Sequence, residues 1–259
     1  MSGLSPKDRM AIKRTKMREQ GADARAKNFK EVNEGLEELA ARQEAKRCLE
    51  CKNKPCVAGC PVAVRIPEFL VKLADGDLAG AAAILREDNA LPATTGRVCP
   101  QEKQCEQLCV HGKKGEPVAI GWLERFVADW AARNMEPPKP PAVKTGRRVC
   151  VVGSGPGGLT AAGELARMGH DVTIFEALHA AGGVLRYGIP EFRLPKDIVR
   201  DEVENLRRMG VEFQTNVVVG RTYTLDDLLR EEGYHAALIA TGAGLPIFMN
   251  IPGEQLCGV

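Results

Sequence analysis

In the first half of the chain, apolar and charged residues are interspersed in a pattern that is typical of helices. Near the middle of the chain, this helical pattern gives way to a different one. A helix is predicted over residues 28–47, which are rich in Glu, Ala, Leu, Lys and Arg and contain no proline. Shorter helices are predicted over residues 66–73 and 78–87, with a turn at Asp75-Gly76-Asp77 between them. A fourth is predicted over residues 117–134, because Pro117 suits a first helical turn. The first half is therefore expected to be helical and rich in loops.

The second half of the chain alternates short apolar runs with helical segments. The predicted strands cover residues 148–153, 171–176, 211–219 and 235–240, and the predicted helices cover residues 156–168 and 196–209. Alternating strands and helices predict a doubly wound parallel sheet, an α/β fold of the Rossmann-like class. The proline-rich stretch at residues 137–141 is a stiff spacer. Two domains are therefore expected, residues 1–145 and residues 146–259.

Composition and charge narrow the classes of function. The formal net charge of +2 gives no electrostatic reason to expect nucleic acid or an anionic membrane as a partner. No apolar run reaches the ~18 residues of a membrane-spanning helix, and no apolar signal segment precedes the first charged residues, so a soluble, cytoplasmic protein is expected. The first thirty residues form a basic arm. It is either a docking strap for a partner subunit or a solvated, partly disordered terminus.

Seven of the nine cysteines fall into two tight groups: Cys48, Cys51, Cys56 and Cys60, followed by Pro61, and then Cys99, Cys105 and Cys109. Soft thiolates on adjacent loops hold cubane iron–sulfur clusters, and bacterial ferredoxins use a similar run ending in Cys-Pro whose last cysteine serves a second cluster. The spacing therefore predicts two clusters. Zinc is the main alternative, but only one Cys-x2-Cys pair is present and seven thiols exceed one tetrahedral site. Disulfides are disfavoured because no signal segment is present.

Two cubanes need eight ligands, and the clustered cysteines supply seven. Cys150 lies in the apolar run before Gly153, where a small buried hydrophobic residue is expected. Cys257 lies far away at the end of the chain. Neither is expected to be the eighth ligand.

A glycine fingerprint follows the first predicted strand. Gly153-x-Gly155-x-x-Gly158 lies where the strand becomes a helix, and Glu176 ends the next strand. Such glycines permit a tight turn, close approach to a pyrophosphate and packing of the helix, while the acid accepts from ribose hydroxyls. The N-terminus of the predicted helix near Pro156 favours binding of a phosphate group, because it carries the positive end of the helix dipole. Glu176 would repel a 2′-phosphate, which leaves NAD and FAD. The neighbouring clusters favour FAD, because a flavin exchanges electrons both in pairs and singly.

Five further segments connect the chain with a known family: Ala45-Lys46-Arg47-Cys48-Leu49-Glu50-Cys51, Gly59-Cys60-Pro61-Val62, Gly96-Arg97-Val98-Cys99-Pro100, Ala119-Ile120-Gly121 and Tyr187-Gly188-Ile189-Pro190-Glu191-Phe192-Arg193-Leu194-Pro195. With these motifs, the chain from about Arg25 onward resembles the N-terminal half of the small (beta) subunit of glutamate synthase. It is similar in the same way to the large subunit of electron-bifurcating NADH-dependent ferredoxin:NADP oxidoreductase and to the N-terminal part of dihydropyrimidine dehydrogenase.

The resemblance implies two 4Fe–4S clusters and assigns their ligands. One set is formed by Cys48, Cys51, Cys56 and Cys109; the other is formed by Cys60, Cys99, Cys105 and one non-cysteine ligand. Relatives place a glutamate or glutamine ligand where Glu124 lies, and His111 is the alternative. Flavin contacts are implied at Gly183, Val184 and Arg193. With the fingerprint, the predicted cofactor-binding residues are Gly153, Ser154, Gly155, Pro156, Gly157, Gly158, Glu176, Gly183, Val184 and Arg193.

The resemblance also implies a function. The chain is expected to belong to an NADPH-dependent oxidoreductase of the glutamate synthase small-subunit type, passing electrons between FAD, two clusters and a large catalytic partner subunit. The alternatives are a subunit of the bifurcating ferredoxin:NADP oxidoreductase type, an electron-transfer module without turnover of its own, and a zinc-stabilised interaction domain fused to a nucleotide sensor. No second glycine fingerprint follows Gly158, and the family's C-terminal flavin segment is not found before Val259. The FAD domain is therefore expected to be incomplete relative to the family, and NADPH oxidation is expected only in a full-length relative.

Overall fold

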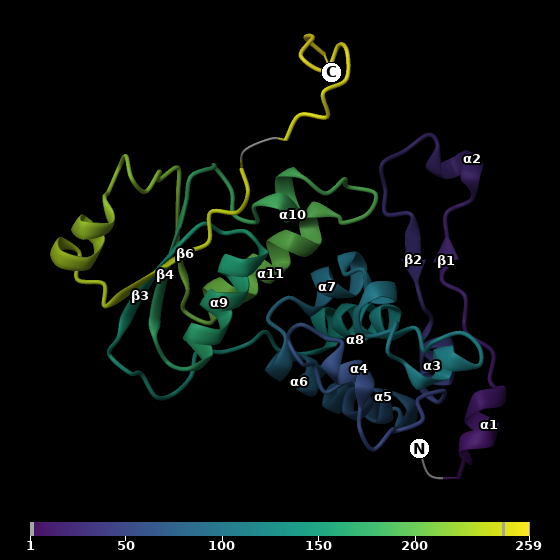
Figure 1. The fold of residues 1–259 in the computed structure, drawn as a ribbon. Helices are drawn as coiled ribbons and strands as arrows, with labels where there is room; N and C mark the ends of the chain where they lie inside the picture. The colour runs from purple at the N-terminus through teal and green to yellow at the C-terminus, as the bar shows by residue number, and fades with distance from the viewer. Residues whose placement is uncertain (1–2, 245–246, 259) are drawn as a thin grey trace.

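The computed structural model describes residues 3–244 and 247–258, which form two bodies lying side by side (Figure 1). The first half of the chain builds a helical body, and the second half builds a body around a parallel sheet. Each body has a buried apolar core of its own. One residue of the first half, Leu91, lies in the core of the second body and is 2% exposed.

The helical body follows the predicted pattern closely. Its helices are α3 (Glu38–Ala45), α4 (Pro55–Ala58), α5 (Ile66–Asp75), α6 (Leu78–Asp88), α7 (Pro92–Val98) and α8 (Ile120–Asn134), with short 3-10 turns η1 (Gln101–Lys103) and η2 (Val110–Lys113). The helices predicted over residues 66–73, 78–87 and 117–134 are confirmed to within a few residues. Between α5 and α6, Gly76 has φ +87°, and the Asp77 carboxylate accepts a hydrogen bond of 2.8 Å from Gly80 N.

A long N-terminal arm precedes these helices. It contains α1 (Pro6–Ala11), β1 (Arg18–Glu19), α2 (Ala22–Arg25) and β2 (Asn33–Gly35), and β1 pairs with β2 in antiparallel fashion. The helix predicted over residues 28–47 is wrong before Glu38, where α3 begins. Pairing of β2 with β1 overrides the helical propensity of this stretch, and Gly35 has φ +85°, which a helix does not allow.

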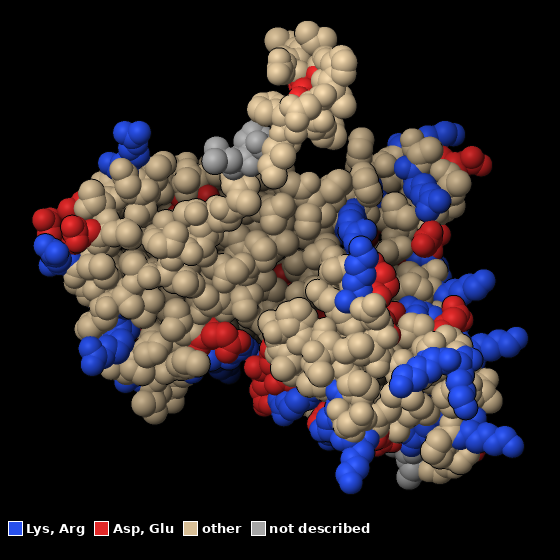
Figure 2. All heavy atoms as spheres, viewed as in Figure 1, with Lys and Arg blue, Asp and Glu red and all other residues tan. Residues whose placement is uncertain are grey.

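The arm packs against the helical body. Arg9 donates to the Cys48 carbonyl at 2.7 Å, and Arg14 forms an ion pair of 2.9 Å with Glu106. Figure 2 shows basic side chains projecting from this body, with acidic side chains among them. These contacts hold parts of the arm against the helical body, while most of its described residues are exposed. Its role as a strap for a partner subunit and its interpretation as a solvated, partly disordered terminus both stay predictions.

The second body is built on a four-stranded parallel sheet with strand order β5-β4-β3-β6. Its elements are β3 (Arg148–Val152), α9 (Pro156–Arg167), β4 (Asp171–Glu176), α10 (Val184–Tyr187), α11 (Lys196–Arg208), β5 (Glu212–Thr215), the π-helical turn η3 (Asp227–Glu231) and β6 (Ala236–Ile239). The strand order reverses between β3 and β6, and the carboxyl ends of strands at such a reversal are where open α/β sheets bind ligands. The predicted parallel α/β sheet is confirmed.

Both faces of the sheet are covered. Helices α9 and α11 contribute Leu159 and Leu206 to the main core, and on the other face Leu228 and Tyr234 pack with Cys150. Cys150 is fully buried, as predicted. The strand predicted over residues 211–219 ends at Thr215 because Asn216 adopts φ +60°, which breaks the extended backbone. Among the described residues, no helix has the combination of length and hydrophobicity needed to cross a bilayer.

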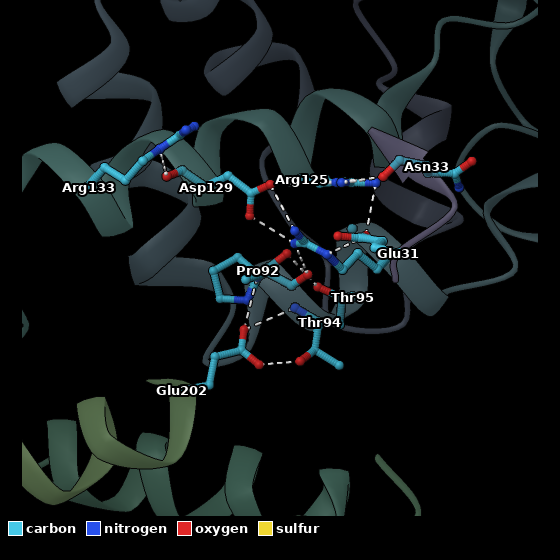
Figure 3. A network of polar contacts seen from close by, with 12 residues as sticks. Glu31, Asn33, Pro92, Thr94, Thr95, Arg125, Asp129, Arg133 and Glu202 are labelled. Carbon is cyan, nitrogen blue, oxygen red and sulfur yellow. Dashed lines mark hydrogen bonds and ion pairs between the residues drawn. The ribbon is translucent and has the colours of Figure 1, made fainter. Parts of the chain in front are cut away.

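A buried carboxylate joins the two bodies. Glu202 on α11 is 6% exposed, and it accepts hydrogen bonds from Ala93 N at 2.9 Å, from Thr94 N at 3.0 Å and from the Thr94 hydroxyl (Figure 3). Burial raises the pKa of Glu202 to about 7, against the opposing effect of these hydrogen bonds. The contact was not predicted, since nothing in the local sequence indicates it.

The raised pKa of Glu202 predicts a pH-dependent stability. The folded chain holds the proton more tightly than the unfolded chain does, so stability is full below about pH 4.5 and falls as pH rises towards about 7. Glu202→Gln removes this titration while keeping an acceptor oxygen. We expect the wild type to lose on the order of 1–3 kcal/mol relative to Glu202→Gln between pH 5 and pH 8, measured as free energies of unfolding in urea. A difference that does not change with pH would contradict the prediction.

Candidate iron–sulfur and dinucleotide sites

The loops that carry the first four cysteines have an unusual backbone. Glu50, Lys54 and Ala63 all have positive φ, between +40° and +53°, although none is glycine. Such conformations cost of order 1 kcal/mol each and persist only where the surrounding structure imposes them. Here they occur in the segment of residues 48–63, from which Cys48, Cys51 and Cys56 line one cavity.

The structure brings the first predicted ligand set together. Cys48 follows α3, Cys51 lies in the next loop, Cys56 lies on α4, and Cys109 precedes η2. All four line one cavity, whose walls include the apolar side chains of Ile66, Leu70, Val118 and Ile120. Burial raises the pKa of Cys48 to about 12 and that of Cys56 to about 11, and the neighbouring thiols of the same set raise both further.

The second predicted set is also brought together. Burial raises the pKa of Cys99 to about 11, and the charges of Glu124 and Cys60 add to this effect. The pKa of Cys105 is raised by burial and then by Glu106, Glu124 and Cys60. The thiols of one set do not influence those of the other in any of these cases. These candidate ligands therefore lie in two groups with the membership that the resemblance implies, and their role as ligands stays a prediction.

Glu124 on α8 is oriented by two polar neighbours. Its Oε1 accepts from Asn89 Nδ2 at 2.8 Å and from the Thr95 hydroxyl at 2.7 Å. Its Oε2 has no hydrogen-bond partner among the described residues. Burial raises the pKa of Glu124 to about 7, which the two hydrogen bonds oppose. One oxygen is thus fixed by the protein, while the other is available to a metal.

His111, the alternative eighth ligand, lies with the other set. It lines the cavity of Cys48, Cys51, Cys56 and Cys109. Its Nδ1 lies 3.2 Å from a guanidinium nitrogen of Arg47, and its Nε2 lies 3.4 Å from the Arg9 carbonyl. Both ring nitrogens are engaged by the protein, away from Cys99 and Cys105.

The donor chemistry fits polynuclear clusters. Buried thiols with raised pKa values keep their protons until cations replace them, and iron supplies the compensating positive charge. Among the residues that the structure describes, no three His, Cys, Asp or Glu side chains converge to hold a single ion. A cubane spreads its ligands over four iron atoms, so its thiolates need not converge on one point.

A buried ion-pair network lies beside the second set. Arg97 on α7 donates to both oxygens of Asp129 at 2.8 and 2.9 Å and to Glu31 of the arm at 2.9 Å. Arg125 on α8 pairs with Glu31 at 3.1 Å and donates to the Asn33 carbonyl at 2.9 Å (Figure 3). The network fastens the arm to α7 and α8, the two helices that flank Cys99 and carry Glu124.

The glycine fingerprint occupies the carboxyl end of β3. Gly153 has φ +105°, and a Cβ there would collide with the Ala240 carbonyl oxygen. A Cβ on Gly158 would collide with the Gly153 carbonyl, so only glycine lets α9 begin so close to the sheet. Gly155, by contrast, faces open space, with nothing within 4 Å of a Cβ built on it. The first-turn amides of α9, where Pro156 is the first residue, receive no side-chain cap and are open to a phosphate.

Glu176 is held in place by Ser154. The Ser154 backbone N donates to Glu176 Oε2 at 3.0 Å and its hydroxyl bonds the same oxygen, while Leu178 N donates to Oε1 at 2.8 Å. The Ser154 hydroxyl also accepts from Gly182 N at 3.0 Å. A carboxylate has about four acceptor positions, so Glu176 retains capacity for ribose hydroxyls.

The remaining predicted flavin contacts are split between two places. Gly183, with φ +50°, approaches Gly155 so closely that a Cβ on it would lie 2.7 Å from the Gly155 Cα, and Val184 follows at the exposed start of α10. Gly157 is exposed on the first turn of α9. Arg193 instead lines a small cavity beside α7, with Gln101 and Trp122 among its neighbours. It lies at the boundary with the helical body.

Comparison with known families agrees with this arrangement. The profile of the family described as dihydropyrimidine dehydrogenase domain II, 4Fe-4S cluster, matches residues 25–136. The profile of the pyridine nucleotide-disulphide oxidoreductases matches residues 147–259. The predicted order, an iron–sulfur domain followed by an oxidoreductase domain with a parallel sheet, is therefore confirmed, and the matches support the predicted cofactor classes, 4Fe–4S clusters and FAD.

Individual relatives come from several enzymes. The NAD-dependent dihydropyrimidine dehydrogenase subunit PreT of Escherichia coli is 39% identical over 84% of this chain and 53% of its own length. The small chain of NADPH glutamate synthase from Mycobacterium tuberculosis is 39% identical over 91% of this chain and 48% of its own. The beta subunit of NADP(+)-dependent formate dehydrogenase from Moorella thermoacetica is 38% identical over 78% of this chain and 31% of its own.

The fold and its two kinds of site match an iron–sulfur domain followed by a pyridine nucleotide-disulphide oxidoreductase domain. The chain is similar to the small chain of glutamate synthase, a similarity that its sequence motifs predict. It spans about half the length of the first curated relatives it matches.

The open space at Gly155 allows a test of whether this loop binds the pyrophosphate of FAD. Gly155→Ala introduces a methyl group that touches no protein atom, at a residue whose φ of −65° any residue adopts. The fold should be unchanged, while a pyrophosphate approaching the loop would meet the methyl group. We expect FAD affinity to fall by roughly tenfold, about 1.4 kcal/mol, measured by equilibrium dialysis.

The matched control is Gly21→Ala in the arm, where a Cβ also meets nothing within 4 Å. It should bind FAD like the wild type. Equal FAD affinity in Gly155→Ala and the wild type would show that the pyrophosphate does not pass over this loop.

Proposed function

We propose that this chain is the electron-transferring part of an NADPH-dependent oxidoreductase subunit, in which FAD exchanges electrons with two 4Fe–4S clusters and, through them, with a partner subunit. The observation that carries the proposal is the separation of eight buried or half-buried candidate ligands into two groups within a domain that abuts a dinucleotide fold. FAD supplies two-electron chemistry and the clusters supply one-electron steps.

The two proposed ligand sets lie in different environments. Cys48, Cys51, Cys56 and Cys109 would hold one cluster in an apolar cavity. Cys60, Cys99, Cys105 and Glu124 would hold the other, with the free Oε2 of Glu124 as the oxygen donor. A carboxylate is a harder ligand than a thiolate, so the second cluster would have a distinct potential and a more labile iron.

The second domain would bind and orient FAD through its own backbone. The α9 amides that follow Gly155 would hold the pyrophosphate, and Glu176, fixed by Ser154, would accept from the ribose hydroxyls. Arg193 lies between this domain and the residues next to Cys99, which supports a role near the flavin end that faces the clusters. Gly183 and Val184 would line the same path.

A partner subunit follows from the relatives. PreT, the glutamate synthase small chain and the formate dehydrogenase beta subunit are each named as one part of a larger enzyme. The substrate of such a complex would belong to the partner. The assignment to the glutamate synthase type, a large catalytic partner and a cytoplasmic location are part of this proposal.

Two matched cysteine variants test the relay. Cys51→Ala should remove only the first cluster and Cys105→Ala only the second, because their ligand groups are separate. In either variant, reoxidation of the reduced flavin by a one-electron acceptor should slow several-fold, measured by anaerobic stopped-flow absorbance, with FAD content unchanged.

Cys257→Ala is the control, since Cys257 is exposed and belongs to neither group. If flavin reoxidation proceeded at the wild-type rate in both cluster variants, the clusters would not lie on the electron path and the proposed function would be wrong.

A further inference from the structure

Helix α7 lacks a cap from its own domain. Its N-cap residue, Leu91, makes no side-chain cap, and its first residue, Pro92, has no N–H to donate. The next two amides, of Ala93 and Thr94, point at Glu202, which reaches them from α11 in the other domain. The carboxylate thus takes the place that an N-cap side chain of the same domain would occupy.

The same helix is packed into the second domain at both ends. Leu91 is part of the core formed by α9 and α11, and Val98, the last residue of α7, packs against that core. Helix α7 packs mainly against α8 of the helical body, while the apolar contacts of Leu91 and Val98 and the cap from Glu202 tie both of its ends to the dinucleotide-binding domain.

Helix α7 also carries or supports two proposed ligands of the second cluster. Thr95 bonds Glu124 Oε1, and Asn89, just before the helix, bonds both Thr95 and Glu124. Cys99 is the C-cap residue of α7, and its backbone N donates to the Thr95 carbonyl at 3.1 Å. A shift of the helix start would therefore move both a thiolate and a carboxylate.

We propose that Glu202 is a positioning residue for the second cluster: through α7, the dinucleotide-binding domain holds Cys99 and Glu124 in the geometry that sets this cluster's potential and retention of iron. The proposal rests on the proposed function, since it requires Cys99 and Glu124 to be ligands. The first ligand set has no member on α7, so the first cluster should be indifferent to Glu202.

The test compares Glu202→Ala with Glu202→Gln in the full chain carrying FAD and both clusters. At pH 8, we expect Glu202→Ala to change the equilibrium constant for electron transfer between the two clusters several-fold. This constant is measured by redox titration followed by electron paramagnetic resonance. Mild oxidation should also give a several-fold larger yield of three-iron centres. Glu202→Gln, which keeps an acceptor oxygen for the amides, should restore most of the wild-type behaviour.

The control Arg167→Met weakens the same domain boundary elsewhere. Arg167 on α9 donates to the Arg86 carbonyl near the end of α6 and pairs with Glu164, and these described polar contacts do not involve α7. It should leave both clusters unchanged. If Arg167→Met and Glu202→Ala changed the second cluster equally, loosened domain packing and not the cap of α7 would be the cause, and the proposal would be wrong.

Glu124→Ala distinguishes the assignment of Glu124 as a ligand from the positioning role of Glu202. If it alters only the second cluster while Glu202→Ala alters neither, the ligand assignment stands and the positioning role of Glu202 is overturned. If Glu124→Ala leaves both clusters unchanged, the ligand assignment fails, and the positioning proposal fails with it.

Discussion

The desolvation of clustered thiols is the constraint on which the helical body depends. Burial raises the pKa of most of these thiols, and neighbouring thiolates raise several further, so the protein has gathered groups that repel each other when ionised. Bound iron turns this repulsion into attraction. The positive-φ residues Glu50, Lys54 and Ala63 are part of the same arrangement, because they lie in the segment that carries the first four thiols.

The surroundings of the two ligand groups differ in kind. The first is walled by apolar side chains of α5 and α8 and by the loop before α8. The second lies beside charged and polar groups, including Glu124, Glu106 and the ion pairs of Arg97 with Glu31 and Asp129. Hydrogen bonding and local charge both tune cluster potentials. The two clusters are therefore expected to differ in potential through their surroundings as well as through their ligands.

The position of α7 explains how two domains joined by a proline-rich spacer keep a fixed relation. The helix has its first turn capped by Glu202, its Leu91 end in the second core, and its Arg97 side chain bonded to the arm and to α8. Electron transfer between a flavin and a cluster requires such a fixed separation. The spacer supplies a connection, and α7 supplies one buried contact beside others such as the Arg167–Arg86 hydrogen bond.

Features encoded locally could be predicted from the sequence. The strands β3 and β4 rest on apolar runs and were predicted correctly. The cysteine groups and the glycine fingerprint rest on short spacings, and the fold brings their residues together, while their roles as ligands stay predictions. Residues 28–37 were mistaken for part of a helix because the β1–β2 pairing joins segments that propensity treats separately. Glu202 was missed because its partner Thr94 lies 108 residues away. Thr95 and Asn89 were missed for the same reason, since only the fold brings them to Glu124.

Iron, acid-labile sulfide and flavin content per chain test the central claim most directly. The anaerobically reconstituted full chain should hold about eight iron and about eight sulfide, with up to one FAD. Saturation at about four iron and four sulfide, or zinc in place of iron, would contradict the division of these eight ligands between two clusters.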